Sequence, residues 1–115
     1  MNRLLRYLVV SVSCFAGSVV ARADDPATNR MFRAKCASCH GEDGKGHTKE
    51  GEKMKIGDMT SPDFQKLTDD KIKETILEGL SRQKNGVKQE MKPLKDKLTP
   101  AQVDALVKYV RSLAK

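Results

Sequence analysis

The sequence contains few aromatic residues and no tryptophan. Of its 115 residues 4% are aromatic, comprising three Phe and two Tyr. A chain of this length forms one domain, and with so few large apolar side chains that domain has a thin core of its own. We therefore expect another apolar body to fill part of the interior.

The sequence also lacks two patterns that would indicate other fold classes. No segment shows the period-two alternation of a half-buried strand, and no internal repeat is present. These absences argue against β-rich and repeat architectures. We expect an all-α domain, built as a bundle of about three to four helices.

A long apolar run is found at the N-terminus only. Residues 4–20 are mostly apolar, Arg3 and Arg6 make the start of the chain positive, and an Ala-Arg-Ala sequence whose small residues suit a signal peptidase follows. We expect residues 1–23 to be a cleaved secretory signal peptide and residues 24–115 to be the mature domain. A retained membrane anchor is the alternative, but Ser and Gly residues interrupt the run. Cys14 lies within it and is expected to be removed with it.

The charge of the chain is moderately basic. The net charge is +7, from 22 Lys+Arg and 15 Asp+Glu, and loss of three arginines with the signal peptide would reduce it to +4. A basic protein can bind nucleic acid, but export to the periplasm argues against this, so we expect no nucleic-acid partner. The lysines indicate either a solvated surface or a docking face for an acidic protein partner.

The distinctive chemistry lies in Cys36-Ala37-Ser38-Cys39-His40, a C-x-x-C-H motif for covalent attachment of c-type haem. In a helical turn Cys36 and Cys39 lie on the same side, so both thiols can reach the two vinyl groups at one edge of a porphyrin. We expect Cys36 and Cys39 to form thioether bonds with one haem c, and His40 to be an axial ligand of its iron. The haem would also supply the apolar body that the core lacks.

Three other interpretations of this motif compete with haem attachment. A thiol–disulfide site usually lies in a βαβ unit, which the sequence does not indicate. A zinc site could use Cys36, Cys39, His40 and His47, but adjacent cysteine and histidine ligands fit a tetrahedral site poorly and no second, distant ligand pair follows. A structural disulfide between the two cysteines is the third alternative.

The first predicted helix carries the motif at its end. Pro26 suits the first helical turn and two preceding aspartates favour the positive helix end, so we expect a helix from there to about Cys39. Phe32 lies one turn before Cys36 on the same face. The following residues, 41–62, are rich in glycine and charge and are predicted to be irregular, with a helical turn after them at 63–67.

Two further helices are predicted in the second half of the chain. Thr68 caps a helix over 69–80, whose isoleucines and leucines recur at four-residue intervals. Thr99 caps the last helix, and Gln102 completes a capping box three residues later. Between these helices the chain is polar, with a turn at Asn85 and Gly86.

A second axial ligand must reach the iron from the face opposite His40, and therefore from a distant segment. Methionine is a soft thioether ligand that raises the reduction potential. Met91 is the best candidate because it lies in the segment between the last two amphipathic helices. Met59, Met54 and His47 are the alternatives.

In these residues the chain resembles the class I, single-haem c-type cytochromes, within the bacterial group near cytochromes c6, c5 and c551. The resemblance extends over residues 24–115. It depends on the haem motif at residues 36–41 and on the aromatic Phe32 in the first helix. It also depends on Met91, which lies shortly before Pro93, and on Leu106 and Tyr109 of the last helix. It implies that Phe32 packs against Leu106 and Tyr109.

Two protein ligands would leave no open coordination position, so we expect an electron carrier and not an enzyme. This carrier would be exported, monomeric and free of a membrane span after signal cleavage, and it would pass single electrons between larger redox proteins. A haem enzyme or gas sensor with an open distal position, and a haem-free thiol or zinc protein, are the alternatives. Six lysines could surround an exposed haem edge and attract an acidic partner: Lys45, Lys49, Lys84, Lys88, Lys92 and Lys95.

Overall fold

The computed structural model describes Gly17 and residues 25–114, so the rest of the predicted signal peptide lies outside the described residues. The described part forms helices and strands in this order: α1 (Pro26–Lys35), α2 (Ala37–His40), α3 (Lys49–Lys53), α4 (Pro62–Gln65), α5 (Asp69–Glu78), β1 (Leu80–Lys84), β2 (Val87–Met91) and α6 (Pro100–Ser112). This mostly helical architecture confirms the predicted fold class. Three short helices and one small sheet accompany the three longer helices.

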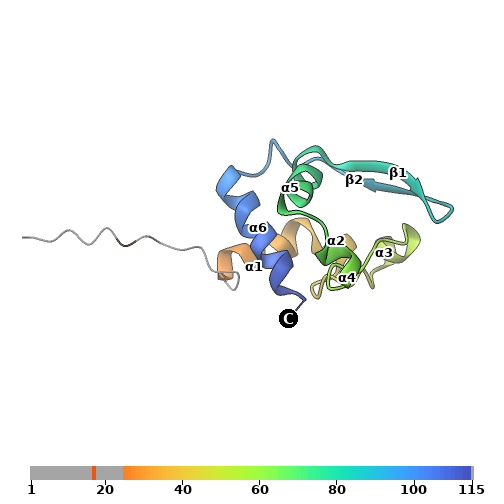
Figure 1. Ribbon diagram of the computed structural model, residues 1–115, viewed down its shortest axis with the longest axis horizontal. Coiled ribbons are helices and arrows are strands. Elements are labelled where there is room, and N and C mark those ends of the chain that lie inside the picture. Colours follow the sequence, from red (N-terminus) through yellow and green to blue (C-terminus); the bar gives the residue numbers. More distant parts are fainter. Residues whose placement is uncertain (1–16, 18–24, 115) are drawn as a thin grey trace, which may run out of the picture.

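Helix α6 crosses α1 at the centre of the domain (Figure 1). Phe32 of α1 is fully buried, and its ring centre lies 4.8 Å from that of Tyr109 on α6, with 44° between the planes. The Tyr109 hydroxyl accepts a hydrogen bond from Asn29 Nδ2 at 2.9 Å, which satisfies the polar end of the ring. Leu106 is buried in the same cluster. The predicted packing of Phe32 against the last helix is therefore confirmed.

The N-termini of α5 and α6 are capped as the sequence predicts. Thr68 Oγ1 accepts a hydrogen bond from the first turn of α5 at 3.1 Å. Gln102 N donates to Thr99 Oγ1 at 3.2 Å, and Thr99 N donates to Gln102 Oε1 at 2.9 Å, which forms the capping box. These bonds satisfy backbone N–H groups that have no partner within the helix. The two helices pack against each other and bury Ile72 and Ile76 of α5.

The segment predicted to be irregular contains the short helix α3. The Thr48 side chain caps it by accepting a hydrogen bond from Gly51 N. Gly51 is buried, and a Cβ atom there would lie 2.6 Å from the Cys39 carbonyl oxygen, so α3 packs directly against the backbone of the C-x-x-C-H motif. A helix of five residues has too few apolar positions for its period to be recognised in the sequence. Helix α4 matches the helical turn predicted near residues 63–67.

Strands β1 and β2 form an antiparallel hairpin between α5 and α6, with Leu80 opposite Met91 (Figure 1). Asn85 and Gly86 have φ angles of 52° and 77°, as the two-residue turns that favour hairpins require. The turn was predicted, but the expectation that no strand is present was wrong. β1 is exposed at four of its five positions, and on the inner face of β2 the polar Gln89 lies between Val87 and Met91, so no continuous alternation of apolar residues marks the two strands.

Among the described residues, no helix combines the length and the apolar composition needed to span a bilayer.

Candidate functional site

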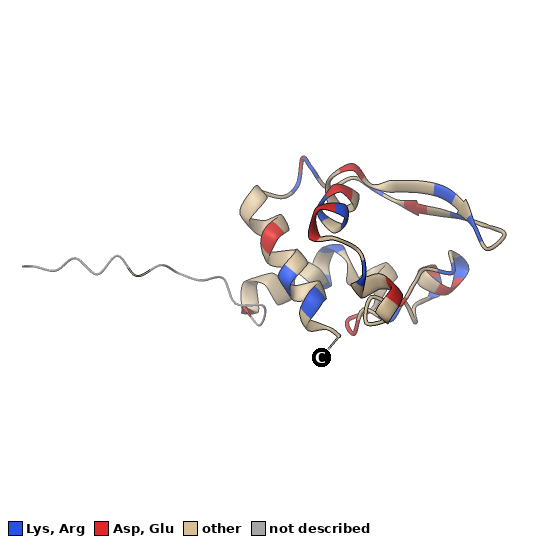
Figure 2. Cartoon of the chain, viewed as in Figure 1, with Lys and Arg blue, Asp and Glu red and all other residues tan. Residues whose placement is uncertain are grey.

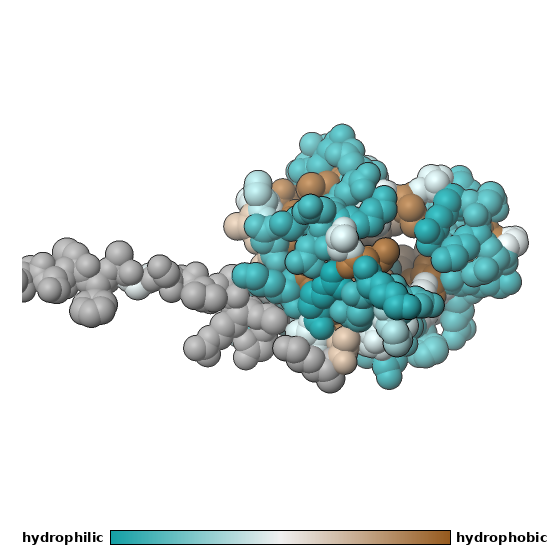
Figure 3. Space-filling view, in the orientation of Figure 1, coloured by the Kyte–Doolittle hydropathy of each residue, from teal (hydrophilic) through white to brown (hydrophobic). Residues whose placement is uncertain are grey.

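An apolar hollow separates the motif from the hairpin. Cys36, His40, Met59 and Met91 line it, and its empty volume, counted with the space open to solvent, is about 570 Å³. The remaining wall is almost entirely apolar and comes from four helices and the connection between α4 and α5: Phe32, Phe64, Leu67, Ile72, Thr75, Ile76, Leu106 and Val110. Figure 3 shows apolar surface within a depression between the hairpin side and the helical side of the molecule.

The C-x-x-C-H motif reaches this hollow because the first helix is interrupted. Cys36 has φ −121° and separates α1 from α2, and the short helix α2 ends at His40. Gly46 N donates to the His40 carbonyl oxygen at 2.8 Å, and Thr48 Oγ1 donates to the Cys39 carbonyl oxygen at 2.7 Å. The two backbone carbonyls are thus held by the segment that follows, which fixes the backbone at the end of the motif.

The His40 imidazole is suited to bind a metal. Its Nδ1 atom is buried and has no hydrogen-bond partner among the described residues. Burial lowers the pKa of His40, so the ring is neutral near pH 7 and keeps a lone pair for coordination. A buried ring nitrogen without a partner is costly unless a ligand engages the imidazole. This orphaned group at an apolar hollow fits a haem iron ligand.

The two cysteines differ in their position relative to the hollow. Cys36 lines it, and burial raises the pKa of its thiol to about 11. Cys39 is half-buried but does not line the hollow. Both thiols are free in this structure, so the structural-disulfide alternative finds no support. Among the described residues, no three His, Cys, Asp or Glu side chains are grouped as a metal site requires, which leaves the zinc alternative unsupported as well.

Met91 also lines the hollow and lies at the end of β2, in the segment between α5 and α6. The chain after it is tied to α5, because Leu94 N donates to the Ile76 carbonyl oxygen at 3.0 Å and Lys95 N donates to that of Leu77 at 3.2 Å. Gly79 has φ +75°, and a Cβ atom there would lie 2.8 Å from Pro93 N and nearer still to the Met91 carbonyl oxygen. The lack of a side chain at this glycine lets the Met91 segment pass against the end of α5.

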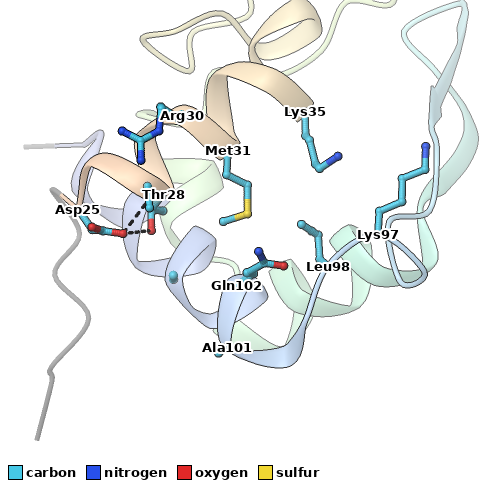
Figure 4. A pocket seen from close by; sticks show the side chains of 11 residues that line it. Asp25, Thr28, Arg30, Met31, Lys35, Lys97, Leu98, Ala101 and Gln102 are labelled. Atoms are coloured by element: carbon cyan, nitrogen blue, oxygen red, sulfur yellow. Dashed lines mark hydrogen bonds between the residues drawn. The ribbon is translucent and has the colours of Figure 1, made fainter.

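The other candidate ligands are separated by the structure. Met59 is 8% exposed and lines the same hollow, so it remains an alternative to Met91. Met54 is half-buried and His47 is exposed, and neither lines the hollow. Met31 points into a different, more open depression between α1 and α6, where it faces Leu98 and Gln102 (Figure 4).

Phe64 and Leu67 form part of the wall that was not predicted from the sequence. Leu67 is 40% exposed although it is apolar. Arg111 of α6 holds this segment in place. Its Nε atom donates to Asp69 Oδ1 at 3.0 Å, and its Nη1 atom donates to the Gln65 carbonyl oxygen at 3.0 Å. A long-range contact of this kind leaves no local pattern in the sequence.

The arrangement combines an apolar hollow with a neutral imidazole, one thiol and two thioether sulfurs in its lining. Imidazole and thioether are ligands of haem iron, and the apolar wall suits a large aromatic ring system. The residues present therefore fit a covalently attached haem.

Comparisons with known proteins agree with this geometry. The profile of the cytochrome c family matches residues 27–114. The cbb3-type cytochrome c oxidase subunit FixP of Azorhizobium caulinodans is 33% identical over 99 residues, which represent 84% of this chain and 30% of that protein. The solved structure of the KustC0563 c-type cytochrome has a TM-score of 0.63 and 35% identity, covering 76% of this chain and 98% of that one. The chain spans less than a third of the length of FixP. It belongs to the cytochrome c family, as a class I-like single-haem c-type cytochrome with covalently bound haem c.

Proposed function

We propose that the chain is an exported electron carrier in which Cys36 and Cys39 hold the haem through thioether bonds, and His40 and Met91 are its axial ligands. The single observation that supports this assignment is the hollow that brings Cys36, His40 and Met91 together from segments 51 residues apart in the sequence. When bound, haem c supplies a one-electron iron couple. A cytochrome c domain transfers electrons, and we assign the two iron ligands within it to a histidine and a methionine.

The chain's own residues would set how this couple behaves. A methionine sulfur stabilises reduced iron and raises the potential, and the apolar walls exclude water, which favours the same state. With His40 and Met91 on the two faces, protein side chains fill both axial positions, so substrate has no access to the iron. This is why a carrier is favoured over an enzyme or gas sensor.

The absorption spectrum of the holoprotein tests this proposal. We expect the ferric form to be low-spin and six-coordinate, with the weak far-red band of sulfur bound to ferric iron, and the ferrous form to bind carbon monoxide poorly. A high-spin ferric form that binds carbon monoxide readily would contradict the carrier and support the sensor or enzyme.

We further propose that the partners are acidic redox proteins, with an oxidase as the acceptor class, because FixP is a cytochrome c oxidase subunit. Lysine and arginine residues are spread over the hairpin, α5 and α6 (Figure 2). All six lysines named from the sequence are exposed. Lys88 and Lys95 form exposed ion pairs with Glu90 and Glu78 at 3.3 and 3.4 Å, which offset part of the positive charge of these two lysines.

The rate of electron transfer to an oxidase should fall as salt is added. Attraction between a basic carrier and an acidic partner is screened over about 8 Å at an ionic strength of 0.15 M, so the second-order rate constant should decrease between low and physiological salt. Stopped-flow oxidation of the reduced protein at several ionic strengths measures this. A rate that is unchanged or rises with salt would contradict an acidic docking face.

A further inference from the structure

Gln89 is the buried polar side chain of the hairpin. It is 4% exposed, and both polar atoms of its side-chain amide form hydrogen bonds. Its Nε2 atom donates to the carbonyl oxygens of Met54 and Lys55, both at 3.0 Å. Its Oε1 atom accepts from Arg82 Nε at 2.8 Å, across the hairpin. A buried amide with every group paired indicates that the neighbouring segments are held in one arrangement.

Gln89 shares a strand face with Met91. Side chains two residues apart in a strand point to the same side, and the burial pattern of β2 follows this rule. Val87, Gln89 and Met91 are buried or half-buried, whereas Lys88 and Glu90 are exposed and pair with each other. The contact at Gln89 therefore fixes the rotation of the strand that directs Met91 into the hollow.

The other end of this contact leads back to the haem motif. Met54 directly follows α3, and Lys55 is one of the described non-glycine residues with positive φ, at 49°. Helix α3 is attached to the motif through Thr48, whose Oγ1 atom accepts from Gly51 N at 2.9 Å and donates to the Cys39 carbonyl oxygen at 2.7 Å. A continuous set of hydrogen bonds thus runs from Cys39 through α3 to Gln89, and joins the two sides of the hollow.

We propose that Gln89 is a positioning residue that holds Met91 against the iron by clamping β2 to the Met54–Lys55 backbone. This inference rests on the proposed role of Met91 as axial ligand. A two-stranded hairpin is only marginally stable by itself, so its position depends on contacts with the rest of the domain. After Met91 the chain is tied to α5 through Leu94 and Lys95, and before Met91 the Gln89 side chain supplies the buried attachment.

Loss of the clamp should make the methionine easier to displace. Exogenous imidazole binds only when the distal position is open, so its apparent dissociation constant varies inversely with the open fraction. In Gln89→Leu two donated hydrogen bonds are lost, and we expect imidazole to bind the ferric holoprotein roughly tenfold more tightly. The far-red sulfur band should disappear at a correspondingly lower imidazole concentration. The titration is followed optically, well below the unfolding temperature.

Gln83→Leu is the matched control. Gln83 lies on β1 of the same hairpin, is exposed and faces Lys88 in the register. The same chemical change there should leave the imidazole affinity within twofold of the unmodified protein, since exposed substitutions have small effects. An equal effect in both variants would overturn the proposal, because the hairpin would then respond to any loss of polarity.

A second variant keeps the test decisive if Gln89→Leu yields no folded holoprotein. Gln89→Asn retains the amide but is one methylene shorter, so it should weaken the contact with Met54 and Lys55 while remaining soluble, and should also tighten imidazole binding. Loss of folded holoprotein in both variants would overturn the positioning role, since Gln89 would then support the whole fold.

Comparing the far-red band of the unmodified protein with that of Met91→Ala shows whether a negative result concerns Gln89 alone or the assignment of Met91 as ligand. If the far-red band is present and is lost in Met91→Ala, Met91 is the ligand, and an unchanged imidazole affinity in Gln89→Leu then overturns the positioning role alone. If the band persists in Met91→Ala, the ligand assignment itself is wrong, and the inference about Gln89 fails with it.

Discussion

Met91→Ala should open one axial position of the haem iron and lower the reduction potential. The thioether sulfur stabilises ferrous iron, so its removal favours the ferric state. Because axial ligands set haem potentials over a span of about 0.8 V, we expect a decrease on the order of 0.1 V or more. The far-red sulfur band should vanish, and carbon monoxide should bind the ferrous form readily. Potentiometric titration and optical spectra of the holoprotein measure these effects.

The same measurements on two other methionines identify the ligand. Met54 lies outside the lining of the hollow, so Met54→Ala is the matched control and should keep both the band and the potential. Met59 lines the hollow and is the structural competitor. If Met91→Ala remains low-spin with sulfur ligation while Met59→Ala does not, Met59 is the axial ligand and the assignment of Met91 is wrong.

Cys36→Ser should strongly reduce the amount of mature holoprotein. The hydroxyl cannot form the thioether at the edge of the hollow, so the haem is held through Cys39 alone. Six of the eleven buried apolar residues in the described part of the chain line this hollow, and a loosely held haem leaves them less well packed. A loss of stability of about 1–2 kcal/mol is enough to lower abundance several-fold. Haem-stained gels and the pyridine haemochrome spectrum measure retention and the number of thioether bonds.

Ser38→Ala is the control for Cys36→Ser. Ser38 lies between the two cysteines and is exposed, so its variant should be produced at the normal level with an unchanged spectrum. Undiminished yield of Cys36→Ser, with two thioether bonds still present, would mean that Cys36 does not anchor the haem.

The helices were predictable to the extent that their signals are local. The capping box of Thr99 and Gln102 and the threonine cap of α5 depend on side chains within one turn of the helix start, and both were found where expected. The hairpin was missed because β1 and β2 are polar and mostly exposed, and strands without an apolar face leave no period in the sequence. Its turn was visible because Asn-Gly is itself a local pattern.

The site shows the same division. The C-x-x-C-H motif is contiguous, so its chemistry could be stated from five residues. The opposite wall comes from segments far along the chain, and Phe64 and Leu67 gain their place through Arg111, more than forty residues later. Contacts at such sequence separation depend on how the helices pack, and no spacing rule predicts them.

By itself the sequence predicted the covalent attachment of haem and His40 as the first iron ligand, and it located the main helices, since each of these depends on neighbours within a few residues. Only the tertiary structure decided that Met91 and Met59 both reach the hollow while Met54 and His47 do not. It also placed Gln89 in a buried contact between the hairpin and α3. The physical reason is that these side chains are selected by burial against distant segments, and burial is settled only when the whole chain has folded around the hollow.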